Sequence, residues 1–250
     1  MHKSTLYKCL PFLVACAGFI GLTLRLWALL QTDEKGFVVL SPIVAVLLVA
    51  LSVAVPAVLL FLAQNLTSIR KYELNFCPSL LAGVGSVLAG LGIGIHSALI
   101  LLLPHDIIDT VSCAFGLICA ISLMICGWYR YTGKTPHFVF HLLPTLYFMV
   151  QLICQFRHWS TDPQLLDYVF QLLAIICLML ASYYRTSFDA GRAPRKSYAF
   201  FALCAGFYCI LSLTNWEEVL MFLGCGIWML TDLCVLEPVS HEGRFYRGDD

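Results

Sequence analysis

Eight long runs of apolar residues follow one another along the chain, and they constrain its fold more than any other feature. The hydrocarbon core of a bilayer is about 30 Å thick, so a helix needs about 20 mostly apolar residues to cross it. A helix also satisfies its backbone polar groups within its own segment, as hydrocarbon requires. The sequence therefore predicts an all-α membrane protein, a polytopic bundle of eight transmembrane helices at Leu10–Leu30, Val38–Leu62, Ser79–Leu103, Thr110–Tyr129, His137–Phe156, Gln164–Tyr184, Ser197–Leu213 and Val219–Leu236.

The composition agrees with a chain that has lipid as its solvent. Of its 250 residues, 60% are hydrophobic and 12% are charged, whereas soluble domains carry about 25% charged residues. The alternating pattern of membrane β-barrels is absent from the apolar runs. Because the connections are short, we expect a single transmembrane domain over residues 1–236 and a short cytoplasmic tail over 237–250.

Lysine and arginine fall unevenly on the two sides of the predicted bundle. If the eight helices alternate in direction, one side receives only three of the fifteen basic residues, Arg25, Lys35 and Arg157. The other side receives the remaining residues, Lys3, Lys8, Arg70, Lys71, Arg130, Lys134, Arg185, Arg192, Arg195, Lys196, Arg244 and Arg247. Basic residues are enriched in cytoplasmic connections. We therefore expect a multipass protein of the cell (inner) membrane with both termini in the cytoplasm.

The sequence carries no familiar catalytic, metal or nucleotide motif. The twelve cysteines form no C-x-x-C pair. Cysteine packs as a small hydrophobe inside apolar runs, where the sequence has Cys113, Cys119, Cys126, Cys154, Cys177, Cys204, Cys209 and Cys225. The net charge of zero disfavours a nucleic-acid partner. Phosphate loops, dinucleotide fingerprints and nucleophile elbows are absent. We expect no metal and no cofactor, and a membrane enzyme is the least favoured of the functions left open.

Small residues recur every four positions along the third predicted helix, at Ala82, Ser86, Gly90, Gly94 and Ala98. This spacing places them on one face, where they allow two helix backbones to approach closely. The face predicts a packing seam. The seam can serve packing within the chain, contact with a second copy, or contact with a partner subunit.

The fifth and sixth predicted helices carry the densest polar grouping. Gln151 and Gln155 are four residues apart and share a face. Because a short connection makes the two helices antiparallel neighbours, we expect Gln151 and Gln155 to face Asp167 and Gln171, with Asp167 near Arg157 or His158. Polar groups at membrane depth are costly unless they are paired or wet. Two readings remain, a ligand-binding site formed by Gln151, Gln155, Asp167, Gln171 and His158, or a set of interhelical hydrogen bonds.

The other ionisable residues near helix ends are expected to reach water. Long or amphipathic side chains at these depths extend to the interface, so we predict this for Arg25, His137, His141 and Asp232. We expect His96 to hydrogen-bond a neighbouring helix.

These features favour a carrier or permease for a small molecule or ion. Gly116–Tyr131 aligns with Gln171–Thr186 at an offset that pairs Tyr129 with Tyr184 and Arg130 with Arg185, as parallel repeats of a transporter would. The alternative is a non-catalytic membrane partner or anchor subunit of a larger complex, with the small-residue seam as its docking face.

Overall fold

The computed structural model describes residues 3–30, 42–64, 76, 78–102, 107–159, 165–191 and 194–236. These ranges contain eight α-helices, a short 3-10 helix η1 (Ser212–Thr214) and no strand. The α-helices are α1 (Lys3–Leu29), α2 (Pro42–Gln64), α4 (Leu80–Leu101), α5 (Ile107–Thr132), α6 (Phe138–Trp159), α7 (Leu165–Asp189), α8 (Arg195–Leu211) and α9 (Val219–Cys234). The predicted all-helical fold with eight helices is confirmed, and the predicted tail over 237–250 lies outside the described residues.

Seven of these helices are long and apolar enough to cross a membrane, and α9 is shorter. Its 16 residues correspond to about 24 Å at 1.5 Å per residue, less than the hydrocarbon thickness of about 30 Å. The chain reaches the start of α9 through η1 and a turn at residues 216–218, and α9 begins at Val219 as predicted but ends two residues before the predicted Leu236. The side chains of Met221, Phe222 and Cys225 are completely buried, so α9 is an interior helix of the bundle.

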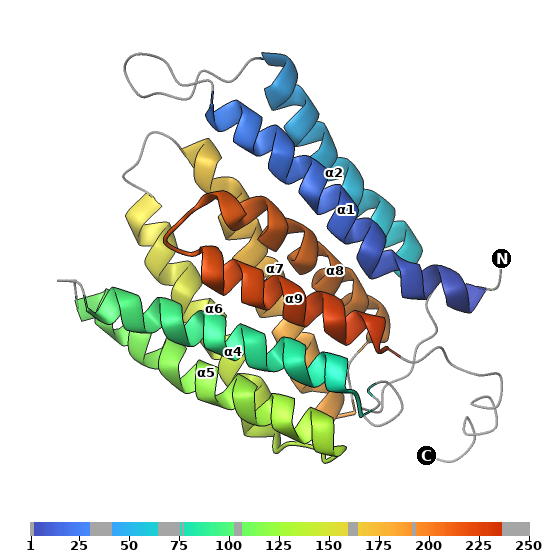
Figure 1. Cartoon of the computed structure of the whole chain (residues 1–250), viewed down its shortest axis with the longest axis vertical. Helices are drawn as coiled ribbons and strands as arrows, with labels where there is room; N and C mark the ends of the chain where they lie inside the picture. Colours follow the sequence, from blue (N-terminus) through green and yellow to red (C-terminus); the bar gives the residue numbers. More distant parts are fainter. Residues whose placement is uncertain are drawn as a thin grey trace.

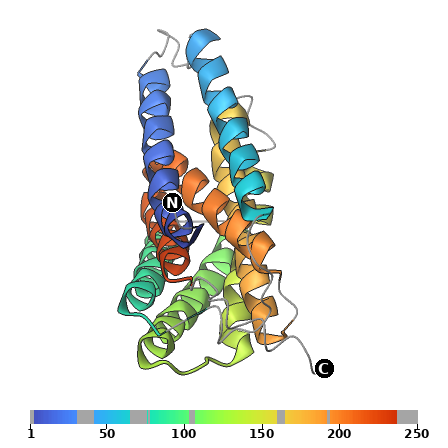
Figure 2. The same ribbon diagram turned by 90° about the vertical axis from the view of Figure 1, so that its right-hand side faces the viewer.

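Six helices form the main body, and α1 and α2 lie along one side of it (Figures 1 and 2). In the body each helix packs against the next in the order α4, α5, α6, α7, α8, α9, and α9 packs back against α4. Outside this body, α1 and α2 both contact α8. Most of the large side chains of α2 remain exposed, including Ile43, Val53 and Phe61. Apolar side chains in this position match lipid as their surroundings.

The small residues of α4 bring its backbone against two neighbouring helices. A Cβ added to Gly90 would lie 2.7 Å from the carbonyl oxygen of Ala120 on α5, and one added to Gly83 would lie 2.9 Å from that of Gly127. Ala82, Ser86 and Gly90 are buried, Gly94 is partly buried and Ala98 is exposed. Most of the predicted seam therefore packs inside the chain.

The prediction that Arg25 reaches water is wrong. Its side chain is 5% exposed and donates a hydrogen bond from Nη1 to the carbonyl oxygen of Leu211 (2.7 Å) at the end of α8. The guanidinium carbon also lies 5.1 Å from the centre of the Phe170 ring. A cation near the C-terminal carbonyls of a helix is stabilised by them, so Arg25 joins α1 to the body.

Candidate functional site

Gln151 and Gln155 lie on the buried face of α6, as their spacing predicts. Ser112 of α5 donates a hydrogen bond to Oε1 of Gln151 (2.8 Å), which fixes the orientation of that amide. The Nε2 groups of both glutamines then point toward one carboxylate, that of Glu218. The two amides therefore hold a buried acid, a partner that sequence reasoning did not anticipate.

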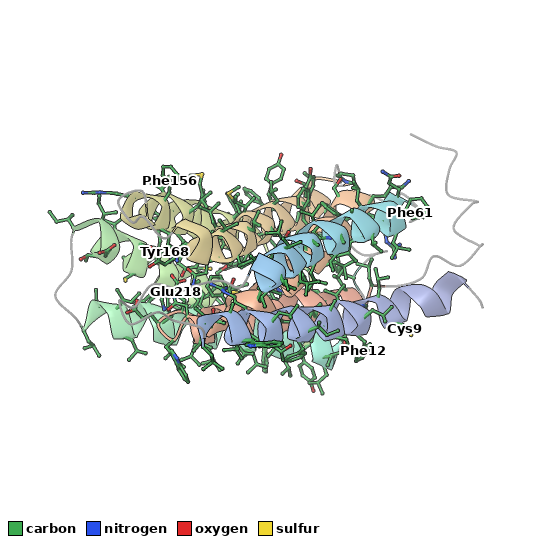
Figure 3. All side chains as sticks on the ribbon, turned by 90° about the horizontal axis from the view of Figure 1, so that it is seen from above. Cys9, Phe12, Phe61, Phe156, Tyr168 and Glu218 are labelled. Atoms are coloured by element: carbon green, nitrogen blue, oxygen red, sulfur yellow. The ribbon has the colours of Figure 1, made fainter. Side chains whose placement is uncertain are left out.

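Glu218 lies in the turn between η1 and α9 and is the N-cap residue of α9. Its side chain makes no cap hydrogen bond to that helix and turns toward α6 instead. There Oε1 accepts from Nε2 of Gln155 and lies 3.5 Å from Nε2 of Gln151. Figure 3 labels Glu218 at the same end of the body as Phe156 and Tyr168, opposite Cys9 and Phe61.

Burial changes the acidity of Glu218. Removal from water disfavours the charged form, and together with the nearby charge of Glu217 it raises the pKa of Glu218 from 4.5 to about 7. Hydrogen bonds from Gln155, Gln151 and Asn215 oppose this rise, because they stabilise the carboxylate. The residue can therefore take up or lose a proton near neutral pH.

On α6, on α7 and in the turn before α9, three acceptor oxygens are buried without a hydrogen-bond donor among the described residues. They are Oε2 of Glu218, Oε1 of Gln155 and Oε1 of Gln171. Gln171 is 2% exposed and lies on α7, the helix that packs beside α6. Buried acceptors normally find a donor or a cation. Among the described residues, no group satisfies these three oxygen atoms.

The remaining predicted site residues lie elsewhere or cannot be placed. The side chains of Asp167 and His158 fall outside the described part of the chain, so the predicted pairing of Asp167 with Arg157 or His158 falls outside it as well. His96 of α4 donates from Nδ1 to the carbonyl oxygen of Glu217 (2.9 Å), in the turn that leads into α9. His96 therefore supports the turn that carries Glu218.

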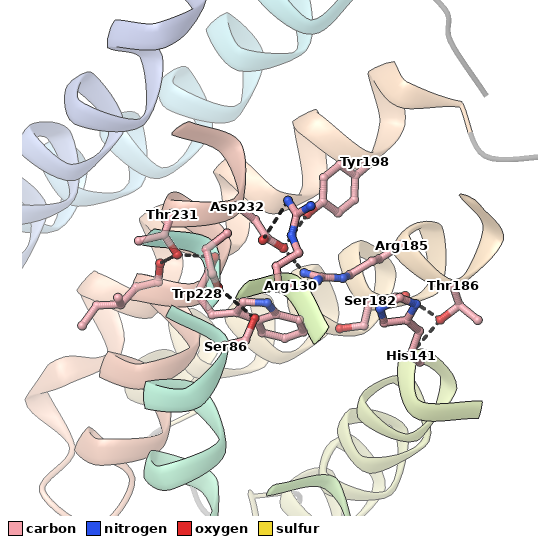
Figure 4. Close-up of polar contacts among 12 residues, drawn as sticks. Ser86, Arg130, His141, Ser182, Arg185, Thr186, Tyr198, Trp228, Thr231 and Asp232 are labelled. Carbon is pink, nitrogen blue, oxygen red and sulfur yellow. Dashed lines mark hydrogen bonds and ion pairs between the residues drawn. The ribbon is translucent and has the colours of Figure 1, made fainter. Parts of the chain in front are cut away.

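A second polar cluster lies at the other end of α9, around Asp232 (Figure 4). Asp232 is completely buried, so the prediction that it reaches water is wrong. Its carboxylate forms ion pairs with Arg185 of α7 and, at 3.8 Å, with Arg130 of α5. Tyr198 of α8 donates a hydrogen bond to Oδ2 (3.2 Å). These contacts join four helices through one carboxylate.

The ring of Phe76 and a hydrogen-bonded pair of His141 and Asp189 extend this Asp232 cluster. The guanidinium carbons of Arg130 and Arg185 lie 4.8 Å and 5.7 Å from the centre of the Phe76 ring. His141 of α6 donates from Nδ1 to Oδ2 of Asp189 (2.6 Å) at the end of α7. His141 is buried, which contradicts the prediction that it reaches water, whereas His137 is exposed as predicted.

The two clusters are separated by the apolar length of α9. At 1.5 Å per residue, the backbone positions of Glu218 and Asp232 are about 20 Å apart. Met221, Phe222 and Cys225 fill the intervening part of α9 and are completely buried. Tyr147 of α6 reaches across to Met221 and donates a hydrogen bond to its sulfur (3.3 Å).

The helices and their apolar surfaces define a multipass α-helical membrane protein. Comparisons with protein-family models, with curated proteins and with solved structures find no match for this chain. Among the described residues, no three His, Cys, Asp or Glu side chains gather as a metal-binding group.

Proposed function

We propose that this protein is a carrier of a small molecule or ion, and that Glu218 with Gln151, Gln155 and Gln171 forms its ligand site. One observation supports the proposal above the others. Glu218 is 8% exposed and has no ion pair within the described part of the chain. A carboxylate in such surroundings is costly, and in membrane proteins such residues mark ion and substrate pathways.

The chemistry of the site suits reversible binding. A carboxyl with a pKa of about 7 changes charge readily, and a bound cation or a ligand's N–H group would offset its buried charge. Neutral amides from α6 and α7 add donors and acceptors that orient a polar ligand. Asp167 and His158 belong to this proposal as further ligand contacts, from the helix ends beside it.

A carrier also needs a second end that can be held closed, and the Asp232 cluster is suited to close that end. Arg130, Arg185 and Tyr198 connect α5, α7 and α8 to α9 through Asp232. Separation of these helices would break buried ion pairs, which is costly. In the proposed cycle this end opens only when the ligand site is occupied.

The orientation belongs to the proposal as well. Among the described residues, Arg130, Lys134, Arg185, Arg195 and Lys196 lie toward the Asp232 end, so by the positive-inside rule we place this end, and both termini, in the cytoplasm of a cell-membrane protein. The Glu218 end then faces outward. The lipid bilayer is the partner that the exposed apolar side chains of α1 and α2 require.

A non-catalytic partner or anchor subunit is the second candidate, favoured by the exposure of α2. The seam of α4 is largely covered by α5 and α9, so docking of a second copy or of another membrane subunit would use α2 instead. Ile43, Val53 and Phe61 are exposed there.

Ligand binding and counterflow separate the two candidates. Purified protein in detergent is screened for thermal stabilisation by amino acids, mono- and dicarboxylates, hexoses and polyamines. Radiolabelled counterflow in proteoliposomes then tests each hit, with protein-free liposomes as the control. A carrier gives a hit that accumulates by counterflow and fails to do so in the Glu218→Gln protein. Absence of both stabilisation and counterflow for every class contradicts the carrier proposal.

A further inference from the structure

We propose that the oxygen atoms of Glu218, Gln155 and Gln171 form a binding site for one sodium ion. This inference deepens the proposed function, because it names the ion that would couple to transport at the same site. It rests on the arrangement and charge of buried oxygen atoms. Binding of the ion can be measured whether or not the protein transports a solute.

The first observation is a set of buried oxygen atoms that are available to a cation. Glu218 Oε2, Gln155 Oε1 and Gln171 Oε1 are all acceptors without a donor among the described residues, and the three side chains are 8%, 6% and 2% exposed. Glu218 and Gln155 are in direct contact through Oε1 and Nε2. Gln171 lies near the start of α7, at a helical depth comparable with that of Gln155 near the end of α6. Hard cations bind to carboxylate and carbonyl oxygens of this kind.

Charge selects a monovalent ion. Glu218 supplies one negative charge, and Gln151, Gln155 and Gln171 are neutral, so one sodium ion leaves the site without net charge. Calcium takes six to eight oxygen ligands, commonly with several carboxylates, whereas this group holds a single carboxylate among its described members. Neutrality matters here because uncompensated charge is costly in a buried site.

The direction of the Glu218 side chain is the second independent observation. The short side chain of aspartate or asparagine at an N-cap accepts hydrogen bonds from the first N–H groups of its helix. Glu218 forgoes this bond and points toward the amides of α6. Its backbone is fixed separately, because its carbonyl accepts from N–H of Phe222 (3.0 Å) and the preceding carbonyl accepts from His96. The turn therefore presents the carboxylate to the oxygen group.

Protons compete with sodium for the same carboxylate. Burial raises the pKa of Glu218 to about 7, so the protonated form dominates below this pH and cannot hold the cation. Other titratable groups at this end of the described body include Glu217 in the same turn, Arg25 on α1, His96 on α4, Asp109 on α5, Tyr147 and Arg157 on α6, and Tyr168 on α7. Sodium affinity should therefore rise with pH through neutrality.

Direct binding of radioactive sodium to the purified full-length protein tests the inference. Protein freed of sodium in choline chloride buffer is incubated with ²²Na⁺, and bound counts are read by scintillation proximity at pH 6 and pH 8.5. We expect saturable binding of about one ion per chain at pH 8.5, displaced by unlabelled sodium chloride and not by choline chloride. At pH 6, the affinity should fall about tenfold, because about one carboxylate in ten remains ionised one unit below its pKa.

Variants identify the site. Glu218→Gln should abolish binding, whereas the matched change of its exposed neighbour, Glu217→Gln, removes only a nearby charge and should retain saturable binding. If Glu218→Gln does not fold, Gln171→Ala is measured in its place and should weaken binding at least several-fold. Absence of saturable ²²Na⁺ binding by the wild-type protein at pH 8.5 overturns the inference, as does unchanged binding by a folded Glu218→Gln protein.

The two proposals fail in different ways. Sodium binding without counterflow of any solute contradicts the carrier proposal and leaves the ion site standing. Counterflow that persists in sodium-free medium, together with absent ²²Na⁺ binding, contradicts the ion site and leaves the carrier proposal standing.

Discussion

Removal of the Asp232 carboxylate should strongly destabilise the body. In Asp232→Asn, the guanidinium groups of Arg130 and Arg185 lose the buried negative charge that both of them face. Loss of one member of a buried ion pair costs about 3–5 kcal/mol. Tyr198 retains an acceptor in the asparagine oxygen, so we expect little additional loss from its hydrogen bond. The expected decrease in the free energy of unfolding is therefore about 4 kcal/mol.

Reversible unfolding in mixed micelles, titrated with sodium dodecyl sulfate and followed by circular dichroism, measures this change. Glu217→Gln is the control, because it also neutralises an acid but at an exposed position. The double variant Asp232→Asn with Arg185→Gln should recover part of the loss, since one of the opposing charges is then gone as well. A decrease below about 1 kcal/mol for Asp232→Asn would refute the reasoning, because an exposed acid contributes about that much.

Three further predictions follow from the packing, the acidity and the charges. Gly90→Leu should destabilise the protein by at least about 1–3 kcal/mol, because its Cβ would meet the Ala120 carbonyl oxygen at 2.7 Å. As the control, Ala98→Leu at an exposed position should change the unfolding free energy little. Equal effects of the two changes would refute the close packing of α4 against α5. In sodium-free detergent solution, the contribution of Glu218 to the free energy of unfolding should fall as pH rises from 4.5 to about 7, because the folded state then binds more protons than the unfolded state. The full decrease across this pH range is about 3 kcal/mol. Glu218→Gln should make the free energy of unfolding nearly independent of pH in this range. Reporter fusions after Lys71, Lys134, Lys196 and the C-terminus should all read cytoplasmic, and fusions near Lys35 and Asp162 external; an external C-terminus would refute the orientation.

The helices could be predicted from the sequence because the bilayer leaves the backbone few alternatives. Long apolar runs must form helices there, and all eight runs do so among the described residues. The length of the last helix was less predictable. Its apolar run extends to Leu236, but the structure ends α9 at Cys234, and only the packing of Met221, Phe222 and Cys225 reveals it as an interior helix.

The glutamines of the candidate site could be predicted and Glu218 could not, and the reason lies in the range of the interactions. Gln151 and Gln155 share a helix face by local spacing, so the sequence identifies them. Glu218 was missed because an acidic pair ahead of an apolar helix is typical of a solvated turn. Its burial depends on α6, which supplies Gln155 from 63 residues earlier in the chain.

The Asp232 cluster shows that the burial of charged side chains at helix ends was equally hard to predict from the sequence. An arginine or aspartate at a helix end can extend to water or turn inward, and only the packing of neighbouring helices decides between them. The alignment of Arg130 with Arg185 in the sequence was the available signal. In the structure both arginines face Asp232.

Charge movement across a membrane tests the carrier proposal together with its sodium coupling most directly. Proteoliposomes with wild-type protein are adsorbed to a solid-supported membrane, and solute classes that stabilise the protein are applied at pH 8 in sodium chloride. The account predicts a solute-evoked current that persists in Glu217→Gln and disappears in folded Glu218→Gln. A current of equal size in Glu218→Gln, or none in the wild-type protein with any stabilising solute, would contradict it.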